Sequence, residues 1–365
     1  MGMKQNSRIE WIDVAKGIGI LLVLAGHAPR DVMRTRYISI DFIYYFIYSF
    51  HMPLFFFLAG VVYEHTKRKK LENRKLTFVA GKAKSLLVPW VSFSVLIYVV
   101  IIILNKVPVI QGMLAGTFME SMSPGDYVYA NLFAENPYSI HVWYMYILFI
   151  IQAMVYLYDW FLRYILKRDD TAGAFGILML LNVGAYFFLA YGQTAQKVWT
   201  YMIYYIMGIL YRKVRQNKEP VFSVLYLPGI VISCCYVWCL SMENLQHPAG
   251  RWVVYQLQNY VGAPMMILLV VSIANSLLRM GRSKCFKWLG ERSFSIYLLH
   301  QPFACAVVGT LLVKLLPSTY FCYVLIMAVC IVCSIFVPIV ITDLGYRLGV
   351  GKILKTFLGV EKRRN

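Results

Sequence analysis

The sequence predicts an all-α fold: a polytopic membrane helical bundle of about ten transmembrane helices, with both termini cytoplasmic. Of its 365 residues, 60% are hydrophobic and 15% are charged, whereas soluble domains carry roughly 25% charged residues. Apolar runs of roughly 18 residues or more, long enough to cross about 30 Å of hydrocarbon, recur along the chain. They lack the alternation of barrel strands. Lipid offers the backbone no hydrogen-bonding partner, so these runs must be helices.

Ten segments have the length and apolar character of membrane spans. They cover residues 12–29, 38–63, 85–104, 140–159, 173–191, 196–212, 221–241, 252–279, 293–315 and 319–343. The first is expected to be a retained span rather than a removed signal peptide, because it carries ionisable residues and lacks a good cleavage site. We see no internal repeat or appended soluble domain, so residues 1–365 are expected to form a single integral membrane domain.

Basic residues alternate sharply between the connecting loops. Of the 36 Lys and Arg residues, 29 lie in six segments. These are residues 1–16, 64–84, 160–172, 211–220, 279–292 and 345–365. By the positive-inside rule these segments are cytoplasmic, as are both termini. The expected location is the inner (plasma) membrane, in a multi-pass arrangement, with the lipid bilayer and not nucleic acid as a partner.

Two loops allow more than one interpretation. The basic loop 64–84, with Lys82 and Lys84, is either an orientation signal on anionic headgroups or a site that meets the phosphates of a cytoplasmic cofactor. The outer loop 105–139 either covers an outward-facing site or is an ordinary connector. Seven of the eight cysteines lie inside apolar runs, without zinc-ligand spacing or a disulfide pattern.

The first span carries three ionisable residues, Asp13, Lys16 and His27, and such residues are functional candidates within a membrane. At 3.6 residues per turn all three share one helix face, with Lys16 and His27 about 16 Å apart along the axis. Asp13 and Lys16 are also compatible with an interfacial ion pair, since long side chains snorkel to the surface. His27 is compatible with a structural, hydrogen-bonded histidine.

The second span adds a deep histidine, His51, followed by Pro53. Proline removes a helix hydrogen bond and is expected to kink the chain beside the imidazole. Two imidazoles on consecutive spans suit general-base chemistry near neutral pH. A metal site is not expected, because no third ligand occurs at convincing spacing.

Several further residues are weaker candidates. His141 and Trp143 open the fourth span, where they either anchor the interface or contact substrate. His300 lies on a polar stripe of the ninth span, about 10 Å from its expected cytoplasmic end. Arg30 and Arg34 belong to an outer cluster that binds either an anionic acceptor or lipid phosphates.

Four motifs together resemble the acyltransferase-3 family of integral membrane O-acyltransferases, most closely its fucose-acetylase-like group. They are WIDVAKGIGILLVLAGHA, SFHMPLFFFLAGVVY, HVWYMYILF and LGERSFSIYLLHQP, in family order. The resemblance implies a transferase that moves an acetyl group from acetyl-CoA to a hydroxyl of a cell-envelope carbohydrate. It implies that His27 is the catalytic histidine and Lys16 the basic residue of the same signature. Asp13 resembles the acidic residue that precedes it, and His51, His141 and His300 match later motifs.

The residues and the resemblance give one hypothesis, in which His27 deprotonates the acceptor and the other catalytic candidates are Asp13, Lys16 and His51. Asp13 lies about 21 Å from His27 along the axis, too far to orient it directly. The expected donor contacts are Lys16, Lys82, Lys84 and His300. The expected acceptor contacts, for an envelope carbohydrate or lipid-linked sugar, are Arg30, Arg34, His141 and Trp143. No metal is expected. Direct transfer and an acyl-histidine relay are both compatible with the sequence. The identity of the acceptor and the oligomeric state, with a homo-oligomer as one possibility, also stay open.

Two other classes of protein compete with the transferase. A proton-coupled transporter of a small solute would also use buried His and Asp residues. A non-catalytic membrane partner of a polysaccharide synthase would not bind coenzyme A.

Overall fold

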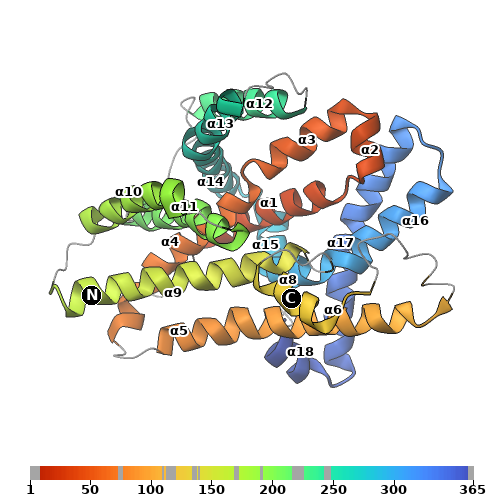
Figure 1. Ribbon diagram of the computed structural model, residues 1–365, viewed down its shortest axis with the longest axis horizontal. Helices are drawn as coiled ribbons and strands as arrows, with labels where there is room; N and C mark the ends of the chain where they lie inside the picture. The colour runs from red at the N-terminus through yellow and green to blue at the C-terminus, as the bar shows by residue number, and fades with distance from the viewer. Residues whose placement is uncertain are drawn as a thin grey trace. The chain divides into compact units, whose positions relative to one another are not determined.

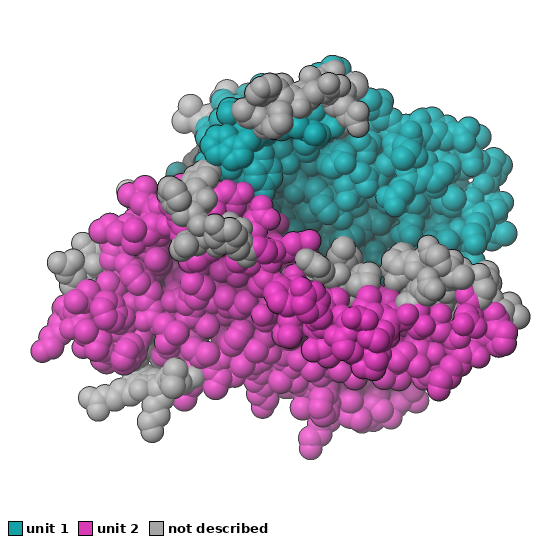
Figure 2. Space-filling view, in the orientation of Figure 1, with its two compact units in different colours: residues 1–58, 215–339, 363–365 teal, residues 59–214, 340–362 magenta. Residues whose placement is uncertain are grey.

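The computed structural model contains helices throughout the part of the chain that it describes (Figure 1). The described residues are 9–72, 77–108, 111, 121–133, 138, 140–167, 172–189, 192–215, 226–241 and 248–360. No strand occurs among them, which confirms the all-α prediction. Contacts divide the chain into two units, coloured separately in Figure 2: residues 1–58, 215–339 and 363–365, and residues 59–214 and 340–362. The single membrane domain stays a prediction.

Each predicted span overlaps one or more helices in the part of the chain that the structure describes. Among the described residues, five helices are long and apolar enough to cross a membrane. The number is six if the bent pair Lys284–Pro302 and Ala304–Leu315 forms one span. The five are Ile38–Thr66, Thr77–Asn105, Trp143–Tyr164, Gly250–Arg279 and Tyr320–Arg347. This confirms a polytopic membrane bundle, while the count of ten and the cytoplasmic termini stay predictions.

The first unit is built around α1. Its elements are α1 (Glu10–His27), α2 (Asp31–Arg36), α3 (Ile38–Tyr48), the start of α4 (His51–Glu72), α12 (Leu227–Ser241), α13 (Pro248–Leu257), η4 (Gln258–Gly262), α14 (Ala263–Arg279), α15 (Lys284–Leu299), η5 (His300–Val307), α16 (Val308–Leu315) and most of α17 (Tyr320–Arg347). Helix α1 packs against α3, α14 and α15, and the short α2 joins α1 to α3 in a hairpin (Figure 1). This hairpin carries most of the candidate residues of the unit.

Glycines set the close approach of α1 and α15. A Cβ added to Gly17 would collide with the backbone of Phe286, and one added to Gly290 would collide with the backbone of Asp13. Small residues let helix backbones come together in this way, so that dispersion contacts replace the missing side chains. The two helices are therefore locked in register along their first halves.

The predicted proline kink appears as a break between α3 and α4, at Ser49 and Phe50. Pro53 has no N–H group, so it cannot bond the carbonyl of Ser49 four residues earlier. The side-chain amide of Gln258 donates to that carbonyl instead, at 3.3 Å. The hydroxyl of Ser233 in turn donates to Gln258 Oε1 at 3.1 Å. The break is thus tied to η4 and α12 by one amide.

The helix that contains the start of the ninth predicted span begins before that span. Helix α15 starts at Lys284 rather than at residue 293 and ends at Leu299, with His300 as its C-cap. His300 therefore lies 16 residues, or about 24 Å, from the start of the helix. Its depth of about 10 Å within the membrane span stays a prediction. The first turns of α15 are rich in charged residues, so the sequence predicted a loop in this region. The chain turns after His300, where Gln301 is extended before Pro302.

The second unit comprises the end of α4, α5 (Thr77–Lys82), η1 (Ala83–Leu87), α6 (Val88–Asn105), α8 (Pro124–Leu132), η2 (Ile140–Val142), α9 (Trp143–Tyr164), α10 (Ala172–Leu189), α11 (Gln193–Arg215), the end of α17 and α18 (Gly351–Leu358). Much of the predicted basic loop 64–84 is helical, because α4 and α5 extend into it; residues 73–76 lie outside the described part. The outer loop 105–139 contains α8, capped by Ser123, whose side chain accepts from the Asp126 amide. The rest of that loop is only partly described.

Candidate functional site

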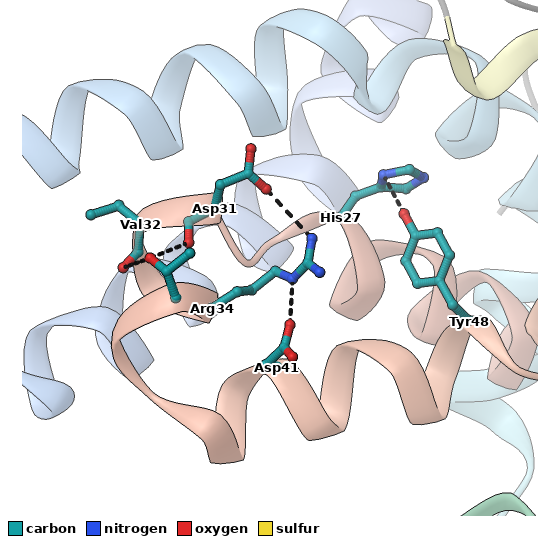
Figure 3. Close-up of polar contacts among 7 residues, drawn as sticks. His27, Asp31, Val32, Arg34, Asp41 and Tyr48 are labelled. Carbon is teal, nitrogen blue, oxygen red and sulfur yellow. Dashed lines mark hydrogen bonds and ion pairs between the residues drawn. The ribbon is translucent and has the colours of Figure 1, made fainter. Parts of the chain in front are cut away.

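Side chains from three helices meet at the carboxyl end of α1. The ring centroids of His27 and His300 are 5.3 Å apart, and the planes are inclined by 48°. The hydroxyl of Tyr48, at the end of α3, lies 3.3 Å from His27 Nδ1 (Figure 3). We call His27, Tyr48 and His300 the histidine cluster. It gives His27 the neighbours from other helices that the sequence alone did not identify.

Members of the cluster differ in exposure. Tyr48 is 37% exposed and His27 is half-buried, whereas His300 and the neighbouring His51 are 0% and 2% exposed. A substrate can therefore reach His27 and Tyr48 more readily than the two buried imidazoles. His51 contacts the Tyr48 ring edge-to-face, with centroids 4.8 Å apart. The histidine cluster therefore has an accessible side, formed by His27 and Tyr48, and a buried side, formed by His300 next to His51.

Backbone carbonyls fix the tautomers of the buried histidines. His300 Nδ1 lies 2.8 Å from the carbonyl oxygen of Tyr297 and 3.1 Å from that of Ile296. His51 Nδ1 lies 2.9 Å from the carbonyl oxygen of Ile47. A carbonyl only accepts, so each Nδ1 carries the proton and each Nε2 of the neutral ring is an acceptor. Both imidazoles thus have their basic nitrogen directed away from their own helix backbone.

An arginine and two tyrosines continue the cluster along the hairpin. The guanidinium carbon of Arg34 lies 3.6 Å from the ring centroid of Tyr44. The Tyr44 ring is stacked on Tyr48, with centroids 4.2 Å apart. Arg34 Nε also donates to Asp41 at 2.9 Å, and Nη1 is 3.4 Å from Asp31 (Figure 3). We call Arg34, Tyr44 and Tyr48 the stacked column.

The charge of Arg34 is well compensated. Burial disfavours the charged guanidinium, but the hydrogen bond to Asp41 and the field of that carboxylate and of Tyr44 outweigh it, so the pKa of Arg34 is raised above its ordinary value. Arg30, the other predicted acceptor contact, donates instead to the hydroxyl of Thr310 at 3.3 Å. Both arginines lie in the first unit, close in sequence to His27. Their contact with an acceptor stays a prediction.

The corner that carries α2 is anchored in a buried cluster. Met33 and Ile40 pack with Tyr323 and Ile326 of α17 and with the cysteines Cys305 and Cys330, all of them buried. Cys305 also donates to the carbonyl oxygen of His27 at 3.3 Å. The end of α1 and the α2–α3 corner are therefore held by packing as well as by polar contacts.

Asp13 and Lys16 lie at the other end of α1 from the histidine cluster. The helix is unbroken from Glu10 to His27, so the predicted separation of about 16 Å along the axis between Lys16 and His27 stands. Asp13 is 3% exposed and lies where α1 meets α15, while Lys16 is half-buried. The structure does not bring these two residues to the imidazoles.

The remaining predicted residues belong to the second unit. Lys82 lies over the ring of Phe78, with Nζ 5.7 Å from its centroid, and Lys84 lies in η1. His141 is buried against Phe93. Trp143 begins α9 and contacts Tyr201, with centroids 5.2 Å apart. Their donor and acceptor contacts stay predictions. Among the described residues no group of three or more His, Cys, Asp or Glu side chains is arranged to hold a metal ion.

Sequence reasoning missed the tyrosines. Tyr44, Tyr48 and His51 follow the i, i+4, i+7 spacing of one helix face, which is a signal that the sequence does contain. Tyrosine is so common at membrane interfaces that the stripe attracts no attention by itself. The functional importance of this stripe depends on His27, which the hairpin places beside Tyr48.

Comparison with known protein families matches residues 9–341 to the family model described as "Acyltransferase domain", acyltransferase family 3. No curated protein and no solved structure matches the chain. The fucose-acetylase-like group stays a resemblance. The family match covers most of the chain and includes the whole histidine cluster. The chain therefore belongs to the acyltransferase-3 family and is a multi-pass membrane acyltransferase.

Proposed function

We propose that this acyltransferase moves an acetyl group from cytoplasmic acetyl-CoA to a hydroxyl of a cell-envelope carbohydrate, with His27 as the general base. The observation that supports this most is the histidine cluster. It combines an accessible imidazole with a phenol and a second imidazole from other helices. Such an arrangement suits proton transfer between an alcohol and a side chain near neutral pH.

The proposed reaction is an acyl transfer between sulfur and oxygen. His27 takes the proton of the acceptor hydroxyl while the oxygen attacks the thioester carbonyl carbon. The carbon–sulfur bond then breaks, the acetyl group stays on the acceptor oxygen, and the thiolate of coenzyme A leaves with the proton returned by the imidazolium. An acyl-histidine relay would divide the same exchange into two steps.

Donor and acceptor contacts follow from charge. Lys16, Lys82 and Lys84 are the proposed partners of the donor phosphates, since ammonium groups bind phosphate as point charges. His300 lies beside His27, so its proposed contact is with the acyl end of the donor. Trp143 and His141 are proposed acceptor contacts from the second unit. A lipid-linked sugar is the alternative form of the acceptor.

Labelled acetyl-CoA tests the proposal. Membrane vesicles that contain the protein are incubated with radiolabelled acetyl-CoA and, in separate samples, peptidoglycan, capsule, lipopolysaccharide and exopolysaccharide. Label that is released by mild alkali measures the hydroxyl ester. We expect transfer to at least one acceptor, and a loss of at least about 100-fold in His27→Gln, because general-base catalysis contributes roughly 10²–10⁴-fold.

A matched histidine controls for general damage. His65 is a half-buried histidine of the second unit, is not a member of the histidine cluster, and has its Nδ1 3.3 Å from Nη2 of Arg212. His65→Gln should keep the activity of the wild type. Full activity of His27→Gln at normal abundance would reject the catalytic assignment. Solute uptake by vesicles without acetyl-CoA, together with no ester in any sample, would favour the transporter, and no binding of coenzyme A would favour the non-catalytic partner.

A further inference from the structure

We infer that Tyr48 is a positioning residue for His27 and that Arg34 acts through it by holding the stacked column. This inference rests on the proposed function, because it assigns a role to residues around the general base. Arg34 was predicted as an acceptor contact, and the inference gives it a different task. The geometry of the hairpin between residues 27 and 51 carries the argument.

The Tyr48 ring is held on two sides. Tyr44 is stacked on it, with planes inclined by 29°, and His51 meets it edge-to-face. Ring pairs of these two kinds are the arrangements that aromatic side chains prefer. The phenol therefore has little freedom to swing, although it is 37% exposed. Its hydroxyl is kept beside His27 Nδ1.

Arg34 closes the column at its other end. Its guanidinium carbon lies 3.6 Å from the centroid of the Tyr44 ring, and cation–π contact favours that position. Asp41 fixes the guanidinium from α3 at 2.9 Å, and both side chains are 18% exposed. A charge paired in this way attracts an incoming anion less than an unpaired one. Arg34 is thus better suited to support than to bind an anionic acceptor.

The hydroxyl of Tyr48 can select the reactive form of His27. A general base on this ring must offer a nitrogen without a proton. When the Tyr48 oxygen accepts from Nδ1–H, the proton stays on Nδ1 and Nε2 is the basic nitrogen. A fixed partner on one imidazole nitrogen is the usual way in which proteins choose the tautomer and orientation of the other. No proton leaves Tyr48 in this role.

Paired tyrosine variants test the inference. Tyr48→Phe keeps the ring and its stacking but removes the hydroxyl. Tyr45→Phe is the matched control, because Tyr45 is the neighbour of Tyr44 on the same helix and its ring lies 5.1 Å from Arg34. Initial rates are measured against acetyl-CoA and against the polysaccharide that accepts label. We expect kcat to fall about 10–100-fold in Tyr48→Phe, the range for a lost hydrogen bond to a group that becomes charged. The KM for acetyl-CoA should stay within about twofold, since Tyr48 is not assigned to donor binding.

Arg34→Lys separates support from acceptor binding. Lysine keeps the charge but loses the planar group that stacks on Tyr44. If Arg34 supports Tyr48, Arg34→Lys lowers kcat, and it lowers kcat little further when Tyr48 is already Phe. If Arg34 binds the acceptor, the KM for the polysaccharide rises in both backgrounds, and the inference about Arg34 is overturned.

The experiments distinguish a failure of the positioning role of Tyr48 from a failure of the proposed function. Equal kcat values for Tyr48→Phe and Tyr45→Phe, with His27→Gln inactive, would overturn the positioning role and leave the general base intact. Wild-type activity in His27→Gln would reject both. Melting temperatures of the variants, measured by size-exclusion chromatography after heating, must stay within a few degrees of the wild type for the kinetic comparison.

Discussion

Replacing Gly290 by Ala would test whether close helix packing positions the histidine cluster. A Cβ at this position would lie 2.7 Å from the carbonyl carbon of Asp13 and 3.0 Å from the amide nitrogen of Gly17, whereas ordinary contact begins near 3.4 Å. Both neighbours are backbone atoms of α1, so no side chain can turn aside. Helices α1 and α15 would have to separate by roughly 1 Å, because a close-packed interior has no space to absorb a methyl group.

Two measurable losses follow from that separation. Overpacking of this kind costs about 1–3 kcal/mol of stability, so the melting temperature should fall. Helix α1 carries His27, and α15 ends at Leu299, next to His300. A displacement of about 1 Å in an active site can reduce the rate about 100-fold. Activity is therefore compared per folded protein, well below the melting temperature, from label released by alkali.

A glycine in an open environment provides the control. Gly176 lies within α10, and nothing lies within 4 Å of the Cβ it would gain. Gly176→Ala should be neutral or should raise stability by about 0.5–1 kcal/mol, because alanine favours the helix. If Gly290→Ala melts and transfers label like the wild type, the close contact of the two helices does not position the site.

Three further changes give results that the contacts specify. Tyr63→Phe removes the 3.0 Å hydrogen bond to the buried carboxylate of Asp159, and should lower stability by about 1–3 kcal/mol in a melting assay; an unchanged melting temperature would contradict this. Gln258→Ala leaves the Ser49 carbonyl without its donor and should lower the melting temperature by a similar free energy, whereas a neutral effect would mean that the break after α3 needs no tie. Cys285 is exposed at the start of α15 and should react with a membrane-impermeant maleimide in inside-out vesicles. The Cys285→Ser variant should not be labelled, and labelling in right-side-out vesicles alone would refute the predicted topology.

Much of the fold was readable from hydropathy. Apolar runs of span length gave the positions of the helices, because lipid leaves a crossing backbone no alternative. Proline at position 53 correctly marked the break between α3 and α4. The tie that repairs it was not readable, since Gln258 lies more than 200 residues away. The start of α15 was missed because its first turns are rich in charged residues and resemble a cytoplasmic loop.

The candidate site was predicted in part. Deep histidines stand out in an apolar sequence, so His27, His51 and His300 could be named. That His300 would meet His27 could not be foreseen, because the two residues lie 273 positions apart and a single sequence does not show which helices pack together. Tyr48 and Tyr44 were overlooked because tyrosine is ordinary near a membrane surface, and only the folded hairpin gives these two a partner.

Helix ends supply an electrostatic setting for the two imidazoles. Helix α1 ends at His27 and α15 ends one residue before His300, so two helix carboxyl termini converge on one point. Aligned peptide dipoles leave about half a negative elementary charge at each such terminus. An imidazole that accepts a proton there becomes a cation facing negative potential that is already in place. The backbone itself can thus do what a carboxylate partner does in other general-base sites. The proposed base, His27, would therefore not need Asp13, which lies at the distant end of the same helix.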